Sequence, residues 1–142
     1  MTAIRSAWRH SAVLFWYAKT TRNSNSSRFG KFLTLQFSPT GRMQGAFMKT
    51  YLLEKSRLLF QAEGERNYHS FYQLLAGSTD AVRARCGLAS EQPVHYAMLN
   101  KSSCTSVASI DDAAEFRETV AAARHLGFTD DEVHHSSPSS AL

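Results

Sequence analysis

The feature that most constrains this chain is a polar segment, Asn-Ser-Asn-Ser-Ser-Arg-Phe-Gly-Lys, at residues 23–31. It places the hydroxyl groups of Ser26 and Ser27 beside the guanidinium of Arg28, and an apolar run at residues 32–37 follows directly. A polar loop that leads into a strand allows a rigid scaffold to hold side chains against a ligand. Hydroxyl groups suit Mg²⁺ and phosphate oxygens, because both are bound at close range by small polar groups. Such a loop could order around a terminal phosphate and relax after hydrolysis.

Composition alone favours a solvated turn, because Asn and Ser side chains often hydrogen-bond to their own backbone. The sequence around the segment reverses this preference. Three blocks of the sequence closely resemble consecutive blocks of the myosin motor domain, in the same order and at about the same spacing. They are residues 18–31, 50–57 and 65–75. The first block resembles switch I, the second reads Thr-Tyr-Leu-Leu-Glu-Lys-Ser-Arg and the third reads Glu-Arg-Asn-Tyr-His-Ser-Phe-Tyr-Gln-Leu-Leu. Kinesin-type motors share an Asn…Ser-Ser-Arg string but lack the Phe-Gly-Lys and Leu-Glu-Lys-Ser-Arg strings.

The resemblance implies a mixed α/β fold, as a fragment of a P-loop NTPase motor domain: an antiparallel β-hairpin after the switch I loop, followed by several helices. It also implies roles for four residues. Asn23 would contact the phosphate chain of ATP, and Ser27 would ligate Mg²⁺. Ser26 would hydrogen-bond the γ-phosphate and help to place the attacking water, while Arg28 would pair with the glutamate of the second switch. Ser26 and Arg28 are therefore the candidate catalytic residues.

In complete form such a protein is an ATP-dependent motor that moves on actin filaments, carries light chains and is cytoplasmic, at the actin cytoskeleton. The remainder of the motor domain would be the first partner of this chain. The sequence contains no Gly-x-x-x-x-Gly-Lys-Ser/Thr phosphate loop and no Asp-x-x-Gly-Phe-Glu second switch. We therefore expect the chain alone to be inactive as an ATPase. The alternative is a non-catalytic relic, or a stand-alone interaction module that uses an exposed sheet edge.

Three parts are expected along the chain: a leader at 1–17 that is unrelated or disordered, a partial motor domain at 18–133, and a disordered Ser/Pro tail at 134–142. The basic and apolar character of residues 1–17 resembles a signal or transit peptide only weakly, and a leader foreign to the fold is an equal alternative. Residues 129–132, Thr-Asp-Asp-Glu, predict a capping box that opens a final helix.

Composition excludes several classes of function. The chain has 142 residues, 43% of them hydrophobic, which suffices for one core. Its net charge of +4 is spread along the chain, whereas a nucleic-acid site needs a clustered basic face. Cys86 and Cys104 form neither a disulfide framework nor a metal-binding spacing. No apolar run approaches the length of a membrane span.

Local patterns predict the secondary structure. We expect two strands, at 32–37 and 46–53, joined by a turn that begins at 38–41. We also expect a short helix at 80–86 and a longer helix that begins at Asp111 or Asp112 and is ended by Gly127. Ser78 or Thr79 would cap the short helix, and Phe116, Val120 and Ala123 would face inward on the long one. Before both of these helices, one apolar helical stripe comprises Tyr68, Phe71, Tyr72 and Leu75 and ends near Gly77.

Several prominent polar residues have structural explanations that we prefer. His69 and His95 lack ligand neighbours at metal spacing, so core or surface positions are expected. Helix capping accounts for Asp111 and Asp112 more simply than a metal pair does. Glu54 is expected to brace the end of the sheet by ion pairing with the basic residues that follow it.

Overall fold

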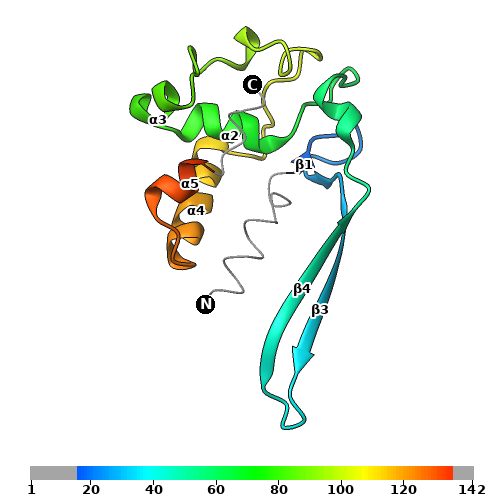
Figure 1. Cartoon of the computed structure of the whole chain (residues 1–142). Coiled ribbons are helices and arrows are strands. Elements are labelled where there is room, and N and C mark those ends of the chain that lie inside the picture. Colours follow the sequence, from blue (N-terminus) through cyan, green and yellow to red (C-terminus); the bar gives the residue numbers. More distant parts are fainter. Residues whose placement is uncertain (1–15, 136–142) are drawn as a thin grey trace.

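The computed structural model describes residues 16–135 of the chain (Figure 1). Two antiparallel hairpins come first, and the helices follow, so the predicted mixed α/β class is confirmed. The elements, in order, are β1 (Tyr17–Ala18), β2 (Ser26–Ser27), β3 (Gly30–Phe37), β4 (Met43–Tyr51), η2 (Lys55–Leu58), α2 (His69–Gly77), α3 (Asp80–Arg85), η3 (Pro93–His95), α4 (Asp112–His125) and α5 (Asp130–His135).

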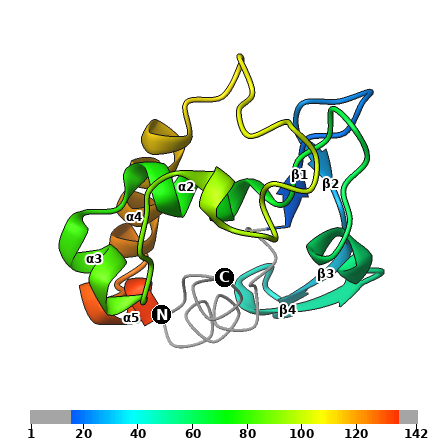
Figure 2. The same cartoon turned by 90° about the horizontal axis from the view of Figure 1, so that it is seen from above.

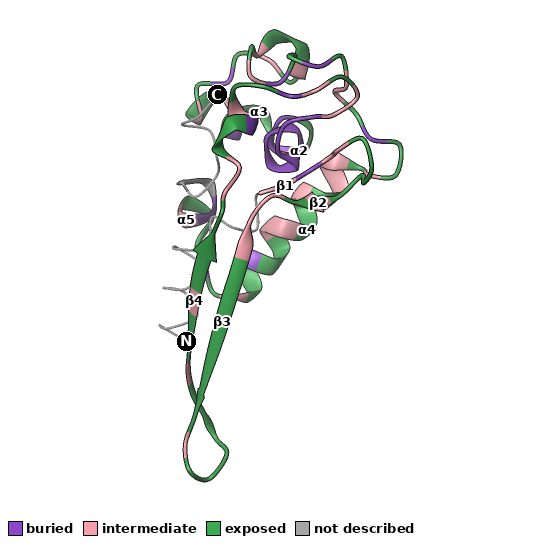
Figure 3. Ribbon diagram, turned by 90° about the vertical axis from the view of Figure 1, so that its right-hand side faces the viewer, coloured by how far each residue is buried: buried purple, intermediate pink, exposed green. Residues whose placement is uncertain are grey.

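Strands β3 and β4 form a long two-stranded ribbon that projects away from the helices (Figures 1 and 3). Its strands lie close to the predicted ranges, although β4 begins at Met43 rather than at 46 and ends at Tyr51. The connecting turn is closed by a hydrogen bond from the amide of Gly41 to the carbonyl of Ser38, at 2.9 Å. Gly41 has φ of +78°, a value that a residue without a Cβ adopts freely.

The ribbon leaves apolar side chains uncovered on both faces within the described part of the chain. Directly paired residues share a face, and the register places Leu33 opposite Met48 and Phe37 opposite Met43. Most of the ribbon is exposed, including Phe32, Leu33, Leu35, Phe37, Met43 and Phe47. An exposed two-stranded hairpin is marginal by itself, because it buries little apolar surface.

The core is built around α2, whose predicted stripe is buried as expected (Figure 3). The residues that pack together are Ala18, Tyr68, Phe71, Tyr72, Leu74, Leu75, Leu88 and Leu99. Seen from above, helices α2 to α5 gather on one side of the molecule and the hairpins lie on the other (Figure 2). Strand β1 reaches this core through a bridge between Ala18 and Tyr68, so the polar loop that follows β1 starts from a buried anchor.

Helices α2 and α4 pack closely because α2 ends in a glycine. A Cβ placed on Gly77 would lie 2.5 Å from the Cβ of Phe116 on α4, a distance that atoms in a folded protein do not tolerate. The inward position predicted for Phe116 is thus explained, and Ala123 on the same helix is fully buried. This contact fixes the position of α4 relative to α2.

The predicted capping residues are present at the starts of α3, α4 and α5. The Thr79 hydroxyl accepts a hydrogen bond from the amide of Val82, and the Asp111 carboxylate accepts one from the amide of Ala114 at 2.9 Å. At α5, the Thr129 amide donates to Glu132 Oε2 at 3.0 Å and the Glu132 amide donates back to Thr129 Oγ1 at 3.3 Å. The capping box is therefore confirmed.

Secondary structure is described on both sides of the 18–133 range expected for the partial motor domain. Trp16 packs edge-on against Tyr68, with ring centroids 4.4 Å apart, and Tyr17 belongs to β1. At the other end α5 continues to His135. The rest of the expected leader and tail lies outside the described residues. Between residues 16 and 135, no helix is long and apolar enough to cross a membrane.

Candidate nucleotide-binding loop

The polar segment is a hairpin loop held between two very short strands. Tyr17 pairs with Ser27 and Ala18 with Ser26, and the amide of Arg28 donates to the carbonyl of Trp16 at 3.0 Å. Residues 19–25 form the loop itself. The buried position of Ala18 explains why so short a ladder persists, because one of its strands is anchored in the core.

Part of the loop satisfies its own backbone. The amide of Thr20 donates to the carbonyl of Asn23 at 2.8 Å, and the amide of Asn23 donates to Thr20 Oγ1 at 3.1 Å. The side-chain oxygen of Asn23 accepts from the amide of Asn25 at 2.9 Å. The Asn23 side chain is thus engaged in a local hydrogen bond, as Asn side chains often are in turns.

Residues 19–21 are also fixed from outside the loop. The ammonium group of Lys19 donates to the carbonyl of Gly64, and the Arg66 amide donates to the carbonyl of Lys19 at 3.2 Å. The Thr21 amide donates to Glu65 Oε1 at 3.3 Å. The loop is therefore docked on the segment that precedes α2.

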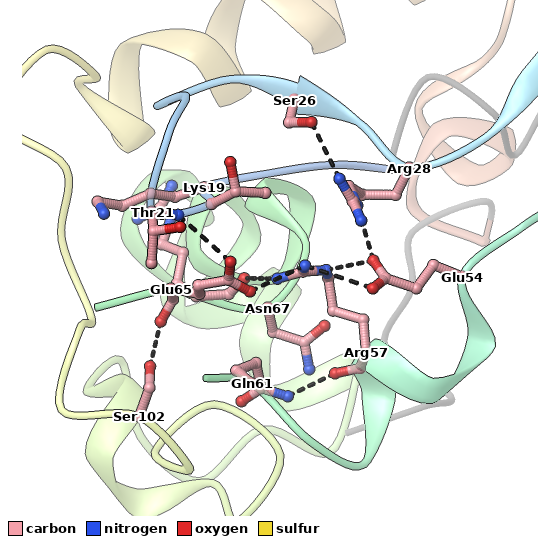
Figure 4. A network of polar contacts seen from close by, with 12 residues as sticks. Lys19, Thr21, Ser26, Arg28, Glu54, Arg57, Gln61, Glu65, Asn67 and Ser102 are labelled. Atoms are coloured by element: carbon pink, nitrogen blue, oxygen red, sulfur yellow. Dashed lines mark hydrogen bonds and ion pairs between the residues drawn. The ribbon is translucent and has the colours of Figure 1, made fainter. Parts of the chain in front are cut away.

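A chain of charged groups connects Ser26 to this same segment (Figure 4). Arg28 donates from Nη1 to Ser26 Oγ at 3.1 Å and from Nε to Glu54 Oε2 at 2.7 Å. Arg57 donates from Nε to the same Glu54 oxygen at 2.6 Å and from Nη2 to Glu65 Oε2 at 3.0 Å. Two arginines and two carboxylates thus alternate along the base of the ribbon, and the predicted ion pair of Glu54 is confirmed with Arg57.

The charges in this chain stabilise one another. Burial acts to raise the pKa of Glu54, but the hydrogen bonds from Arg28 and Arg57 outweigh it and lower the pKa below its ordinary value. The hydrogen bond with Glu54 raises the pKa of Arg28 above its already high value. The phenol of Tyr68 donates to the carbonyl of Glu54 at 2.5 Å, and burial raises its pKa to about 12. All these groups keep their charge state near neutral pH.

The structure brings only part of the predicted site together. Ser26 and Arg28 are in contact and partly buried, whereas Ser27 is exposed. Because side chains alternate along a strand, Ser27 projects from the opposite side of β2 to Ser26. No cluster of three His, Cys, Asp or Glu residues occurs in the described part of the chain, so a metal ion at Ser27 would need further ligands from a nucleotide or from other segments. The donor groups fit one wall of a magnesium–nucleotide site, with hydroxyls and a guanidinium but no phosphate cradle.

A second polar cluster lies behind the loop and was not predicted. Arg66 is fully buried, forks onto Asp112 with distances of 2.8 and 2.6 Å, and lies over the ring of Tyr72 at 4.3 Å. Asp111 caps α4 as expected, and Asp112 lies in the first turn of the same helix, where an acidic residue is favourable. Asp112 also neutralises the buried Arg66 guanidinium, which would be costly if left unpaired. His69 is buried beside Arg66, in agreement with the core position expected for it.

Comparison with known proteins identifies the family. The family model described as "Myosin head (motor domain)" matches residues 13–137, which is most of the chain. This chain belongs to the myosin head family. It is 46% identical to the myosin-I heavy chain of Dictyostelium discoideum over 118 residues. These residues make up 83% of this chain and 5% of that protein.

Other myosins give the same result. The myosin IC heavy chain of Acanthamoeba castellanii is 46% identical over 120 residues, which cover 84% of this chain and 10% of that protein. The unconventional myosin-Ic of Danio rerio is 46% identical over 119 residues, which cover 84% of this chain and 12% of that protein. The chain thus spans only a small part of the length of the curated relatives that it matches.

Proposed function

We propose that this chain forms the switch I wall of the nucleotide pocket of a myosin motor, which in complete form hydrolyses ATP and moves on actin filaments in the cytoplasm. The observation that carries the proposal is the contact of Arg28 with both Ser26 and Glu54. It holds a hydroxyl and a guanidinium side by side at the end of a loop that is anchored in the core. Membership of the myosin head family supports the same role.

Each residue of the loop has a separate task in this proposal. The exposed hydroxyl of Ser27 ligates Mg²⁺, and the Ser26 hydroxyl donates to the γ-phosphate and orients the attacking water. The Asn23 side chain leaves its local hydrogen bond with Asn25 and turns to the phosphate chain. When ATP and Mg²⁺ are bound, they supply the phosphoryl group and the charge that these residues position.

Arg28 acts as the gate of the pocket. Its pairing with Glu54 is the open arrangement, and the glutamate of the second switch competes for the same guanidinium when the pocket closes. Glu54 keeps Arg57 as a partner after the exchange, so the departure of Arg28 does not leave its carboxylate unpaired. Light chains and the filament bind other parts of the motor.

The experiment is a chimaera in which residues 18–133 replace the matching segment of a related myosin motor. The chimaera should hydrolyse ATP with Mg²⁺ and respond to actin. Arg28→Ala should leave ATP binding largely intact and slow hydrolysis strongly, because the exchanged ion pair exists only in the closed state. Ser27→Ala should instead weaken Mg²⁺-dependent binding. Ser38→Ala, at the tip of the ribbon, serves as the control and should change neither.

Two outcomes would contradict the proposal. Hydrolysis at the unmutated rate in Arg28→Ala would remove the gate role, and nucleotide binding unaffected by Ser27→Ala would remove the metal ligand. A charge reversal at Arg28 combined with the opposite reversal at the second-switch glutamate should recover part of the rate, as expected of a coupled pair.

A second candidate is a non-catalytic interaction module, favoured by one observation. The β3–β4 ribbon exposes large apolar side chains, namely Phe32, Leu33, Leu35, Phe37 and Met43, and exposed apolar patches often mark interaction sites. The edge of such a ribbon offers unpaired backbone groups to another strand. Sedimentation of the 142-residue chain distinguishes the two: a defined complex that Phe37→Lys dissolves would favour the module, and a monomer without ATPase activity would favour the motor fragment.

A further inference from the structure

A cavity of about 470 Å³ lies between the end of α2, the start of α3 and the helix α4. Its volume falls within the range of roughly 300–1,000 Å³ that is typical of small-molecule sites. Helices α3 and α4 lie on the side of the molecule away from β1 and β2 (Figure 2). The polar loop contributes none of the described residues that line the cavity, which is therefore separate from the candidate nucleotide-binding loop.

Apolar side chains form part of the cavity wall. Val82 of α3 is buried, and Phe116 and Val120 of α4 are partly buried. Phe116 and Val120 are four positions apart, so they lie one turn apart on the same face of α4. Gly77 lets the end of α2 approach Phe116, which holds this apolar surface between the helices. A ligand with an apolar body would be stabilised by covering it.

Two arginines of α4 add positive charge to the same cavity. Arg117 and Arg124 are exposed, and they lie three positions before and four positions after Val120, so all three share one face of the helix. The described residues that line the cavity include no aspartate or glutamate. An anion in the cavity would therefore meet two guanidinium groups and no carboxylate in the described part of the wall.

Both arginines retain donors for a ligand. The side chain of Arg117 has no hydrogen-bond or ion-pair partner between residues 16 and 135. Arg124 donates from Nε to Asp130 Oδ1 at 2.7 Å, outside the cavity wall. Because a guanidinium carries five N–H donors, this bond leaves the two Nη groups of Arg124 for other acceptors.

Ser78, in the turn between α2 and α3, supplies a third polar group. It is only 7% exposed, and its Oγ is buried without a hydrogen-bond partner among residues 16–135. Its backbone is already engaged, because its amide donates to the carbonyl of Leu74 at 3.1 Å and its carbonyl accepts from Arg83 Nη1. A buried hydroxyl without a partner lowers stability, and proteins rarely keep one. An oxygen of a ligand in the cavity would satisfy it.

We propose that this cavity between α2, α3 and α4 is a binding site for a small organic anion with an apolar body. The body packs against Phe116 and Val120. Arg117 and Arg124 hold the acidic head group, a carboxylate or a phosphate monoester, and the Ser78 hydroxyl donates to it. The site does not depend on the proposed switch role, because no residue of the polar loop takes part.

The experiment uses nuclear magnetic resonance on the full 142-residue chain. The probe is 4-phenylbutyrate, 4-phenylbutyl phosphate tests the second head group, and 4-phenylbutanol is the uncharged control. The methyl signals of Val82 and Val120 should shift saturably with at least one of the two anions. The alcohol should bind about tenfold more weakly than the tighter anion, the change that corresponds to one lost charge-assisted hydrogen bond.

Substitutions assign the separate contacts. Arg117→Gln should weaken binding of the anion about tenfold and leave binding of the alcohol unchanged, because it removes only the charge. Ser78→Ala should also weaken binding of the anion, yet raise the Tm of the free protein, because it removes a buried hydroxyl without a partner. A hydroxyl that served only the fold would lower the Tm when removed. Arg42→Gln, at an exposed arginine beside the turn of the ribbon, is the control and should change neither.

Three results would overturn the proposal: no saturable shift of Val82 and Val120 with either anion, equal affinity for the anions and the alcohol, or equal effects of Arg117→Gln and Arg42→Gln. Arg117 is exposed, so its replacement should not prevent folding. Ser26→Ala should leave binding of the probe unchanged. Failure here is therefore separate from failure of the chimaera described above, which tests the polar loop.

Discussion

The Nε atom of Arg28 lies 2.7 Å from Oε2 of Glu54, although the whole β3–β4 ribbon separates the two residues in the sequence. The backbone repeats the contact, because the Glu54 amide donates to the Arg28 carbonyl at 3.1 Å. The base of the ribbon is thus closed by both main chain and side chains. The same carboxylate oxygen binds Arg57 at 2.6 Å, so one acidic group joins the loop, the ribbon and η2.

The first prediction concerns this shared carboxylate. Glu54→Gln should lower the free energy of unfolding by about 1–3 kcal/mol, because it weakens the hydrogen bonds of Arg57, which is almost fully buried. Urea unfolding followed by circular dichroism measures the change. Asp80→Asn is the matched control: Asp80 pairs with Arg83 but is 97% exposed, so its loss should cost less than about 1 kcal/mol. Equal losses in both variants would show that Glu54 is not a structural junction.

A second prediction concerns the pH dependence of stability. Burial and the charge of Arg66 lower the pKa of His69 from 6.5 to about 4, while Asp112 and Ser24 oppose them. Between pH 4 and pH 6.5, His69 therefore binds a proton in the unfolded chain but not in the native chain. Stability should be full above pH 6.5, fall by up to about 1.4 kcal/mol per pH unit as the pH drops toward 4, and level off below that value.

The same urea experiment, repeated between pH 4 and pH 7.5, tests this slope. His69→Gln should lose the part of the pH dependence that His69 contributes, whereas His95→Gln should retain it. A slope that is identical in all three proteins would mean that His69 titrates alike in the folded and unfolded states.

The third prediction concerns the contact between α2 and α4. Gly77→Ala should destabilise the fold by about 1–3 kcal/mol, since the new methyl group would overlap with Phe116 on α4. In an isolated helix the same change would be favourable, so the sign of the effect reports the packing. Thermal unfolding measures it, and the double variant Gly77→Ala, Phe116→Ala should relieve the overlap. A more stable Gly77→Ala protein would show that the two helices separate easily.

The fourth prediction concerns activity. The purified 142-residue chain should show no ATP hydrolysis with Mg²⁺, with or without actin filaments, because it has no phosphate loop to hold the β- and γ-phosphates. A coupled phosphate-release assay tests this against a complete myosin motor as the positive control. Turnover that persists in Ser27→Ala would point to a contaminant, and turnover that this substitution abolishes would contradict the prediction.

The sequence predicted the helices well because their signals are local. Thr79 and Asp111 lie directly before the turns that they cap, and the stripe of α2 repeats at helical spacing. The two-residue strands β1 and β2 were missed, since a ladder so short leaves no periodic pattern. The pairing of Tyr17 with Ser27 joins residues ten positions apart, which local patterns do not reveal.

The members of the candidate site could be predicted only where they are neighbours in the sequence. Ser26 and Arg28 could be chosen from one string, but the partner of Arg28 lies beyond the ribbon. The contact of Asp112 with Arg66 was not predicted, because the two residues are 46 positions apart in the sequence.

The exposure of the β3–β4 ribbon has a consequence for the way the molecule opens. Its side chains share almost no buried surface with α2, so the ribbon can unravel as a separate cooperative unit while the helical block remains intact. Twisting of the ribbon therefore requires little work against the core. The Arg28–Glu54 ion pair lies where this ribbon meets the polar loop, so it is one of the contacts through which a twist of the ribbon would reach the loop.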